Sequence, residues 1–118
     1  MNYLQAVQEI TELVPDFETE LKENRNPNSY SVIRTFTERI KNMIRQNDSN
    51  LLLKSLQKMD KIYTDGDVAL KNAIENTFIY SLDNFTAFCS KEDRKMIFSH
   101  ISSTLKSSYS RQIYNHGI

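Results

Sequence analysis

The fold is decided by the stretch Tyr3–Leu21, YLQAVQEITELVPDFETEL. Its apolar side chains recur every three or four positions, which places them on one stripe of a helix; they are Tyr3, Val7, Ile10, Val14, Phe17 and Leu21. Pro15 interrupts this run, and proline is tolerated in the first turn of a helix but disrupts its interior. The alternatives are therefore a kinked helix or two short helices, and we favour two helices that share the stripe.

The same spacing of apolar residues continues through the rest of the chain. Turns separate further predicted helices that begin at Ser29 or Ser31, at Ser49, at Asp67 and at Ser90, and the last of these continues to about Tyr109. Gly66 suits the left-handed backbone position that ends many helices. We therefore predict an all-α fold of five or six antiparallel helices, either a compact bundle or a HEAT-like array of helical hairpins.

The composition agrees with one small helical domain. The chain has 118 residues but only two glycines and two prolines, whereas an all-β domain of this size needs many turns that favour these residues. We expect residues 1–118 to form a single helical domain in which residues 110–118 are a partly irregular tail.

The charge balance limits the classes of partner. Fifteen basic and fifteen acidic side chains cancel, so no overall field attracts nucleic acid or an anionic membrane. No apolar run reaches the roughly 20 residues that cross a bilayer. Cys89 has no second cysteine to pair with, and Glu9 and Glu12 interrupt any apolar signal sequence, so a cytoplasmic protein is expected.

No arrangement of residues predicts a catalytic, cofactor or metal site. Cys89, His100 and His116 lie too far apart for a zinc motif, and the two glycines cannot build a phosphate-binding loop. A Cys89–His100 pair, or one of the carboxylate pairs Glu9–Glu12, Asp16–Glu20 and Glu92–Asp93, could support catalysis only with perturbed pKa values, which burial would have to produce. We expect a protein that is not an enzyme and binds no cofactor.

Two rows of basic residues are candidate binding surfaces. Arg34, Lys41 and Arg45 recur on one predicted helix, and three lysines recur in the same way on the next helix: Lys54, Lys58 and Lys61. These rows either form a patch for an acidic partner or a nucleic-acid backbone, or solvate outer helix faces and pair with Glu38, Asp60 and the acidic residues of the first helix. We favour the second explanation.

The tyrosines give a second set of candidates. Tyr80, Tyr109 and Tyr114 exceed what one core stripe requires, and tyrosine is favoured in protein interfaces. Packing between neighbouring helices explains them equally well.

The stretch Lys71–Leu82, KNAIENTFIYSL, resembles the central helix of small bacterial proteins that contain the domain of unknown function 7674. The preceding connection at Asp65–Asp67 and the later stretch Leu105–Gln112 are also similar to that family. The resemblance implies a helical, bacterial, cytoplasmic protein, and it supplies no catalytic residues.

The leading hypothesis is a protein-binding module that binds another protein. Its narrower form, an immunity-type inhibitor, is an analogy with small enzyme-free proteins that neutralise a toxin. A nucleic-acid-associated helical domain is the first alternative, and a small enzyme is the second.

Overall fold

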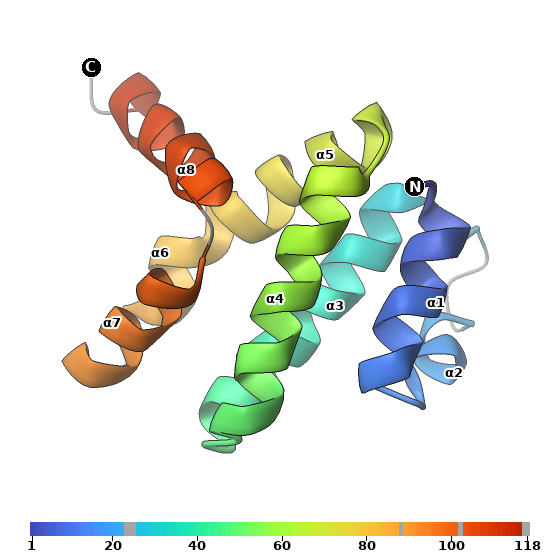
Figure 1. Cartoon of the computed structure of the whole chain (residues 1–118), viewed down its shortest axis with the longest axis horizontal. Helices are drawn as coiled ribbons and strands as arrows, with labels where there is room; N and C mark the ends of the chain where they lie inside the picture. The colour runs from blue at the N-terminus through green and yellow to red at the C-terminus, as the bar shows by residue number, and fades with distance from the viewer. Residues whose placement is uncertain (23–25, 88, 102, 117–118) are drawn as a thin grey trace.

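A computed structural model describes residues 1–22, 26–87, 89–101 and 103–116, apart from the side chains of residues 85, 103, 104 and 113–116. These residues form helices and no strand (Figure 1). The helices are α1 (Tyr3–Leu13), α2 (Phe17–Leu21), α3 (Ser29–Arg45), α4 (Ser49–Asp65), α5 (Val68–Ile74), the π-helical segment η1 (Glu75–Ile79), α6 (Tyr80–Thr86), α7 (Lys91–His100) and α8 (Ser103–His116). Because α5, η1 and α6 follow one another without a break, they are one helix, and the described chain has seven helices rather than five or six.

The N-terminal stripe has the predicted structure. The chain leaves the helical path at residues 14–16, so α1 and α2 are separate helices, as the position of Pro15 predicted. Phe17 is fully buried, and its ring meets that of Phe36 edge-on at 6.2 Å between centroids. Burying these two rings against each other fixes α2 on α3, since an edge-to-face pair adds to the free energy gained by burial alone.

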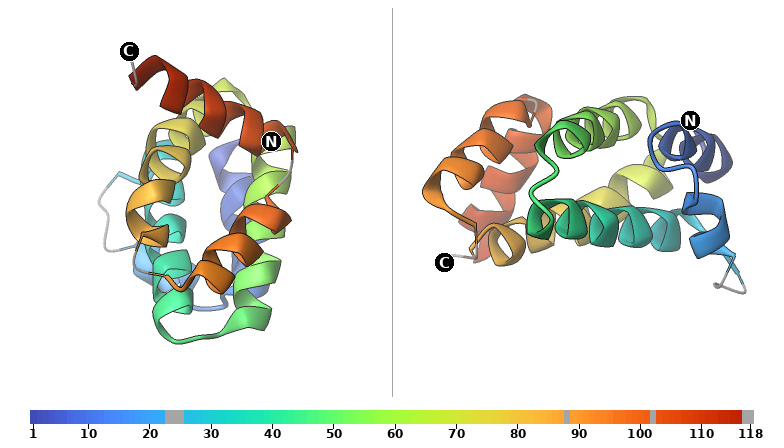
Figure 2. Two further views of the ribbon diagram at one scale, coloured as in Figure 1. Left: turned by 90° about the vertical axis from the view of Figure 1, so that its left-hand side faces the viewer. Right: turned by 90° about the horizontal axis from the view of Figure 1, so that it is seen from below.

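The helices form two layers (Figure 2). One layer contains α1, α4 and α7, and the other contains α2, α3 and the helix α5–η1–α6. Helix α8 crosses one end of the molecule, where it contacts η1 and α4. The buried apolar residues form one cluster between the layers, so the sides of both layers that face away from each other are exposed to solvent.

Helix caps separate the helices much as predicted. Asp67 and Ser90 accept hydrogen bonds from the backbone N–H groups three positions later, as N-caps do. The cap of α3 is Asn28, and Ser31 completes a reciprocal pair of hydrogen bonds with it. The N-cap is therefore Asn28 and not one of the two predicted serines, because asparagine caps a helix as well as serine does.

The prediction for Gly66 was wrong. Its φ angle is −71°, which any residue can adopt, and glycine is needed there for space: a Cβ atom would lie 2.4 Å from the carbonyl oxygen of Ile62. Among the described residues, the left-handed non-glycine position is Asn47, with a φ of 57°, at the turn between α3 and α4. Asparagine is one of the few side chains that tolerate this conformation.

The C-terminal region also differs from the prediction. A single helix was expected from Ser90 past Tyr109, but the backbone is extended at Ile101, with a φ of −81° and a ψ of 134°, and this ends α7. Ile101 is buried, so the chain turns there to direct its side chain into the core. Residues 110–118 were expected to be a partly irregular tail, whereas α8 continues to His116, and residues 117 and 118 lie outside the described residues. Tertiary contacts explain this, since Gln112 donates a hydrogen bond of 2.8 Å to the Glu75 carbonyl of η1.

Candidate protein-interaction face

The lysines of α4 contact α1 instead of forming a free basic row. The Lys58 ammonium lies 2.7 Å from Glu9 and 3.2 Å from Glu12, and Lys61 lies 2.9 Å from Glu9. The hydrogen bond from Lys58, followed by that from Lys61, lowers the pKa of Glu9. Only 14% of the Lys58 side chain is exposed, so its ammonium is committed to these two carboxylates.

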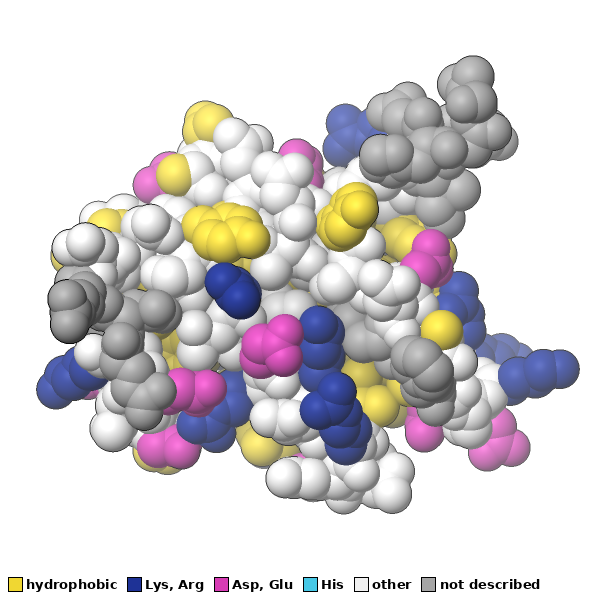
Figure 3. All heavy atoms as spheres, turned by 180° about the vertical axis from the view of Figure 1, so that it is seen from behind, with side chains coloured by type: hydrophobic (Ala, Val, Ile, Leu, Met, Phe, Trp, Pro, Cys, Tyr) yellow, Lys and Arg dark blue, Asp and Glu magenta, His cyan; other side chains and the backbone are white. Residues whose placement is uncertain are grey.

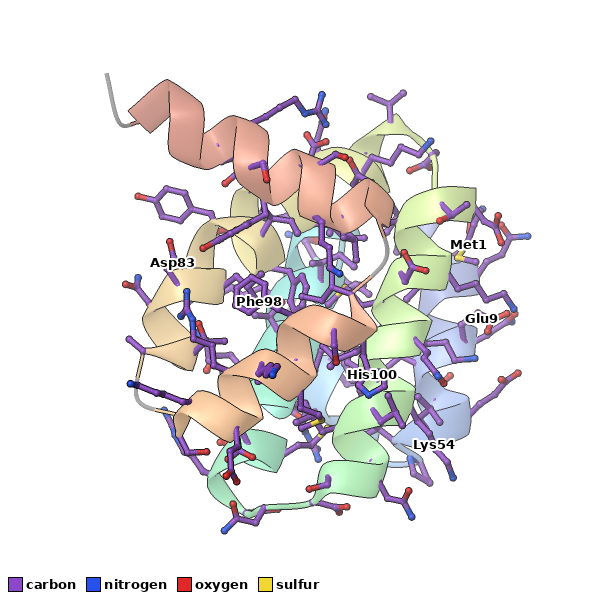
Figure 4. All side chains as sticks on the ribbon, turned by 60° about the vertical axis from the view of Figure 1, so that its left-hand side comes forward. Met1, Glu9, Lys54, Asp83, Phe98 and His100 are labelled. Atoms are coloured by element: carbon purple, nitrogen blue, oxygen red, sulfur yellow. The ribbon has the colours of Figure 1, made fainter. Side chains whose placement is uncertain are left out.

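The third lysine of this row, Lys54, lies one turn before Lys58 and is exposed. Figure 4 shows it on α4, on the side of the molecule where Glu9 projects from α1. Within the described residues it has no ion pair. The predicted α4 row therefore divides into two lysines that connect helices and one that faces solvent.

The basic residues of α3 face away from the core. Arg34 and Arg45 are exposed, and Arg45 makes only a long, 3.4 Å hydrogen bond to Asn42 of the same helix. Lys41 lies 3.1 Å from Glu38, also in α3. Across the described part of the chain, none of these three cations forms an ion pair with another helix, so all three remain available to a partner.

Arg39 shows the contrast within the same helix. It forms an ion pair with Asp16 at 2.7 Å and a second one with Glu20, both of which belong to the segment that carries α2. The hydrogen bond from Arg39 lowers the pKa of Asp16. Arg39 lies on the flank of α3 next to α2, whereas Arg34 and Arg45 lie on the outward side.

The three candidate tyrosines have different environments. Tyr80 follows η1 directly and is 64% exposed. Tyr109 is half-buried: its hydroxyl donates to Asp83 of α6, and its ring lies 5.2 Å from that of Phe98 of α7. The side chain of Tyr114 lies outside the described residues.

Tyr109 therefore belongs to a contact that holds α6, α7 and α8 together. Figure 4 shows Phe98 between α6 and α7, with Asp83 at the neighbouring edge of α6. The guanidinium of Arg94 lies 4.9 Å from the centroid of the Phe98 ring and donates a 2.7 Å hydrogen bond to Thr86. Burial, and then the bond to Asp83, raises the pKa of Tyr109. The packing explanation considered for this tyrosine fits its contacts better than an interface does.

A residue absent from the sequence-based candidates completes the exposed set. Tyr30, in the first turn of α3, is 52% exposed and precedes Arg34 by one turn. We name the tyrosine–arginine face as the outward side of α3 and α6 that carries Tyr30, Arg34, Lys41, Arg45 and Tyr80. The signal was present in the sequence, because Tyr30 lies off the stripe of Ile33, Phe36 and Ile40.

Helices α3 and α6 belong to the same layer, in which α5 and η1, the segments that precede α6, pack against α3. Figure 3 shows this side of the molecule, where Lys and Arg side chains gather along its middle next to exposed hydrophobic ones. Hydrophobic and basic side chains are thus mixed on this side of the molecule.

Cys89 and His100, the nucleophile and base considered for catalysis, do not meet. Cys89 precedes α7 and His100 ends it, so a helix of ten residues, roughly 15 Å long, separates them. Burial, and then Asp93, raises the pKa of the Cys89 thiol. Among the described residues, no group of three or more His, Cys, Asp or Glu side chains could hold a metal ion. No helix in the described ranges is long and apolar enough to cross a membrane.

Comparison with known proteins adds one match. A model of the domain of unknown function (DUF7674) matches residues 7–115. No curated protein and no solved structure matches the chain.

Proposed function

The chain belongs to the family of the domain of unknown function (DUF7674), and from the exposed side chains of its own surface we propose that it is a protein-binding module whose partner docks on the tyrosine–arginine face. The observation that supports this most is the exposure of Tyr30 and Tyr80, 52% and 64%, in the same layer of helices as Arg34 and Arg45, which no other described helix engages. Tyrosine and arginine are the residue types enriched among the energetically dominant positions of protein interfaces.

A protein partner fits this surface better than a nucleic acid does. Lys58 and Lys61, two of the three α4 lysines on which the nucleic-acid hypothesis partly depended, are engaged by α1, so the remaining cations of the two rows are few and interrupted by Glu38. Nucleic-acid binding draws most of its affinity from many phosphate contacts. The alternative predicts salt-sensitive retardation of DNA or RNA at low salt, and the absence of retardation would end it.

Binding without catalysis is part of the proposal. The raised pKa of Cys89 opposes a reactive thiolate, and the carboxylates of α1 and α2 are held by Lys58 and Arg39. A cytoplasmic location, which a single cysteine favours, is also part of it. The proposal also includes an architecture of antiparallel, HEAT-like helical hairpins, which the arrangement of the helices in two layers supports.

The experiment compares partner capture by matched variants. Arg34→Ser/Tyr80→Ser removes one basic and one aromatic side chain from the face, and Leu4→Ser/Lys54→Ser removes one basic and one apolar side chain elsewhere. Leu4 is 59% exposed, so the control changes a comparable surface. Two interface hot spots of about 2 kcal/mol each would lower affinity about 1,000-fold. Proteins retained equally by both variants, or recovery of only chaperones and ribosomal proteins, would contradict the proposal.

The narrower proposal is an immunity-type inhibitor. It predicts that the captured partner is a toxin whose activity the chain abolishes at a one-to-one ratio, while Arg34→Ser/Tyr80→Ser inhibits only at much higher concentration. If the chain alters no activity of the captured partner, the inhibitor proposal is wrong and the binding-module proposal stands.

A further inference from the structure

A hollow of about 430 Å³ lies at one end of the tyrosine–arginine face, between the last turns of α3 and the start of α7. Its described lining residues are Lys41, Ile44, Arg45, Asn47, Cys89, Ser90 and Asp93. The volume lies within the range of small-ligand sites, which combine an apolar wall with a few polar groups. We call it the α3–α7 hollow.

The charges that line the α3–α7 hollow favour an anion. Two cations, Lys41 and Arg45, face one carboxylate, that of Asp93. The internal partners of the cations are weak: Glu38 is 56% exposed where it meets Lys41, and the Arg45 hydrogen bond is 3.4 Å long. An incoming oxyanion can therefore replace them.

The start of α7 is not what makes the site. Ser90 already caps it by accepting a hydrogen bond from the Asp93 N–H at 3.1 Å, and two acidic residues occupy its first turn. Those acidic side chains balance the positive end of the helix dipole. Attraction for an anion thus comes from the two α3 side chains, which also belong to the tyrosine–arginine face.

The lining also limits the anion's shape. The hollow is larger than one oxyanion needs, and Ile44 and Cys89 supply an apolar wall. A carboxylate at the end of a short aliphatic chain would use both features. We propose that the α3–α7 hollow binds the carboxylate of an acidic side chain, which, resting on the proposed function, belongs to the protein that docks on the tyrosine–arginine face.

The test uses the full chain labelled with ¹⁵N and two capped peptides, acetyl-Ala-Glu-Leu-Ala-amide and the same peptide with Gln in place of Glu. The expected result is a saturable shift of the amide signals at Lys41, Arg45, Asn47 and Ser90, with the Glu peptide bound about tenfold more tightly. Lys41→Gln/Arg45→Gln should lower the affinity for the Glu peptide by at least about tenfold, since a charge-assisted hydrogen bond is lost at each position. Lys54→Gln, the matched control, should bind like the wild type.

Three outcomes would overturn the inference. They are equal binding of the two peptides, unchanged binding by Lys41→Gln/Arg45→Gln, and shifts caused by inorganic phosphate but not by the Glu peptide. The Arg34→Ser/Tyr80→Ser variant separates this inference from the proposed function. It should keep Glu-peptide binding in the hollow even though it loses the partner protein. If it keeps the partner while the hollow binds the Glu peptide, only the proposed docking face is wrong.

Discussion

Replacing Lys58 by methionine tests whether the α4 lysines stabilise the fold instead of binding a partner. Methionine keeps most of the aliphatic stem and removes the ammonium, which lies 2.7 Å from Glu9 and 3.2 Å from Glu12. With 14% of the Lys58 side chain exposed, the variant leaves two α1 carboxylates facing α4 without their shared cation. The change should therefore destabilise the packing of α1 on α4.

The contacts set the size of this effect. Breaking a fully buried ion pair costs about 3–5 kcal/mol, whereas an exposed pair contributes about 0–1 kcal/mol. Glu9 is 21% exposed and Glu12 is 67% exposed, and Lys61 still contacts Glu9 in the variant. We expect a loss of about 1–2 kcal/mol in the free energy of unfolding, which lowers Tm by about 4–8 °C in a domain of this size.

Urea unfolding at pH 7, followed by far-UV circular dichroism, measures this loss. Lys54→Met is the matched control and should change the free energy of unfolding by no more than about 0.5 kcal/mol. A double-mutant cycle with Glu9→Gln should give a coupling of about 1 kcal/mol between Lys58 and Glu9. If Lys58→Met is no more destabilising than Lys54→Met, or if the coupling is zero, the α4 lysines are not structural and become partner-binding candidates again.

Three further predictions concern pH, a glycine and the cysteine. The pKa values of Glu9 and Asp16 are lowered in the folded state, so the stability that these carboxylates contribute is complete above about pH 4.5 and is lost as pH falls through their folded-state pKa values. The variant Glu9→Gln/Asp16→Asn should therefore show a smaller decrease in the free energy of unfolding on acidification. An unchanged dependence on pH would contradict the assignment. Gly66→Ala should lower the free energy of unfolding by about 1–3 kcal/mol, measured in urea, because the new Cβ meets the Ile62 carbonyl oxygen at 2.4 Å; a neutral result would show that the turn can shift. The Cys89 thiol, whose pKa is raised, should react with iodoacetamide at pH 7.5 about tenfold more slowly than in the urea-unfolded chain, and equal rates would reopen the thiol-enzyme hypothesis.

The helices could be predicted where local sequence determines them. The stripe from Val7 to Leu21 is buried as its spacing requires, and Asp67 and Ser90 cap helices because their short side chains reach the backbone N–H groups three residues later. The break at Ile101 could not be predicted in this way. The spacing of Ile97, Ile101 and Leu105 suits one straight helix, and the chain bends there because burying Ile101 and docking α8 on η1 outweigh the local preference.

The glycine shows a different kind of failure. A glycine after a helix suggests a left-handed residue, but a short distance to a carbonyl oxygen can require glycine equally well. The two causes leave the same letter in the sequence. Only the φ angle and the surrounding atoms distinguish them, and at Gly66 the φ of −71° shows that space is the cause.

The candidate site was predictable in part for a related reason. Both basic rows have helical spacing. The sequence therefore could not show, for either row, whether its side chains face the core, another helix or solvent. The acidic excess of residues 1–23 was the available signal, and the structure shows how it is distributed: α1 engages Lys58 and Lys61, and the segment of α2 engages Arg39. Much of the uneven charge is therefore complementarity within the molecule.

The basic residues that the acidic segment 1–23 does not engage define the proposed binding face. Arg34, Lys41 and Arg45 lie on the side of α3 that α1 and α2 do not reach, so no carboxylate from those helices compensates them. Burying the exposed Arg34 and Arg45 against an uncharged surface would be costly, because each loses its hydration without gaining a charged partner. A protein that covers this face must then present carboxylates of its own, and the exposed tyrosines supply the apolar area that charge pairs alone do not.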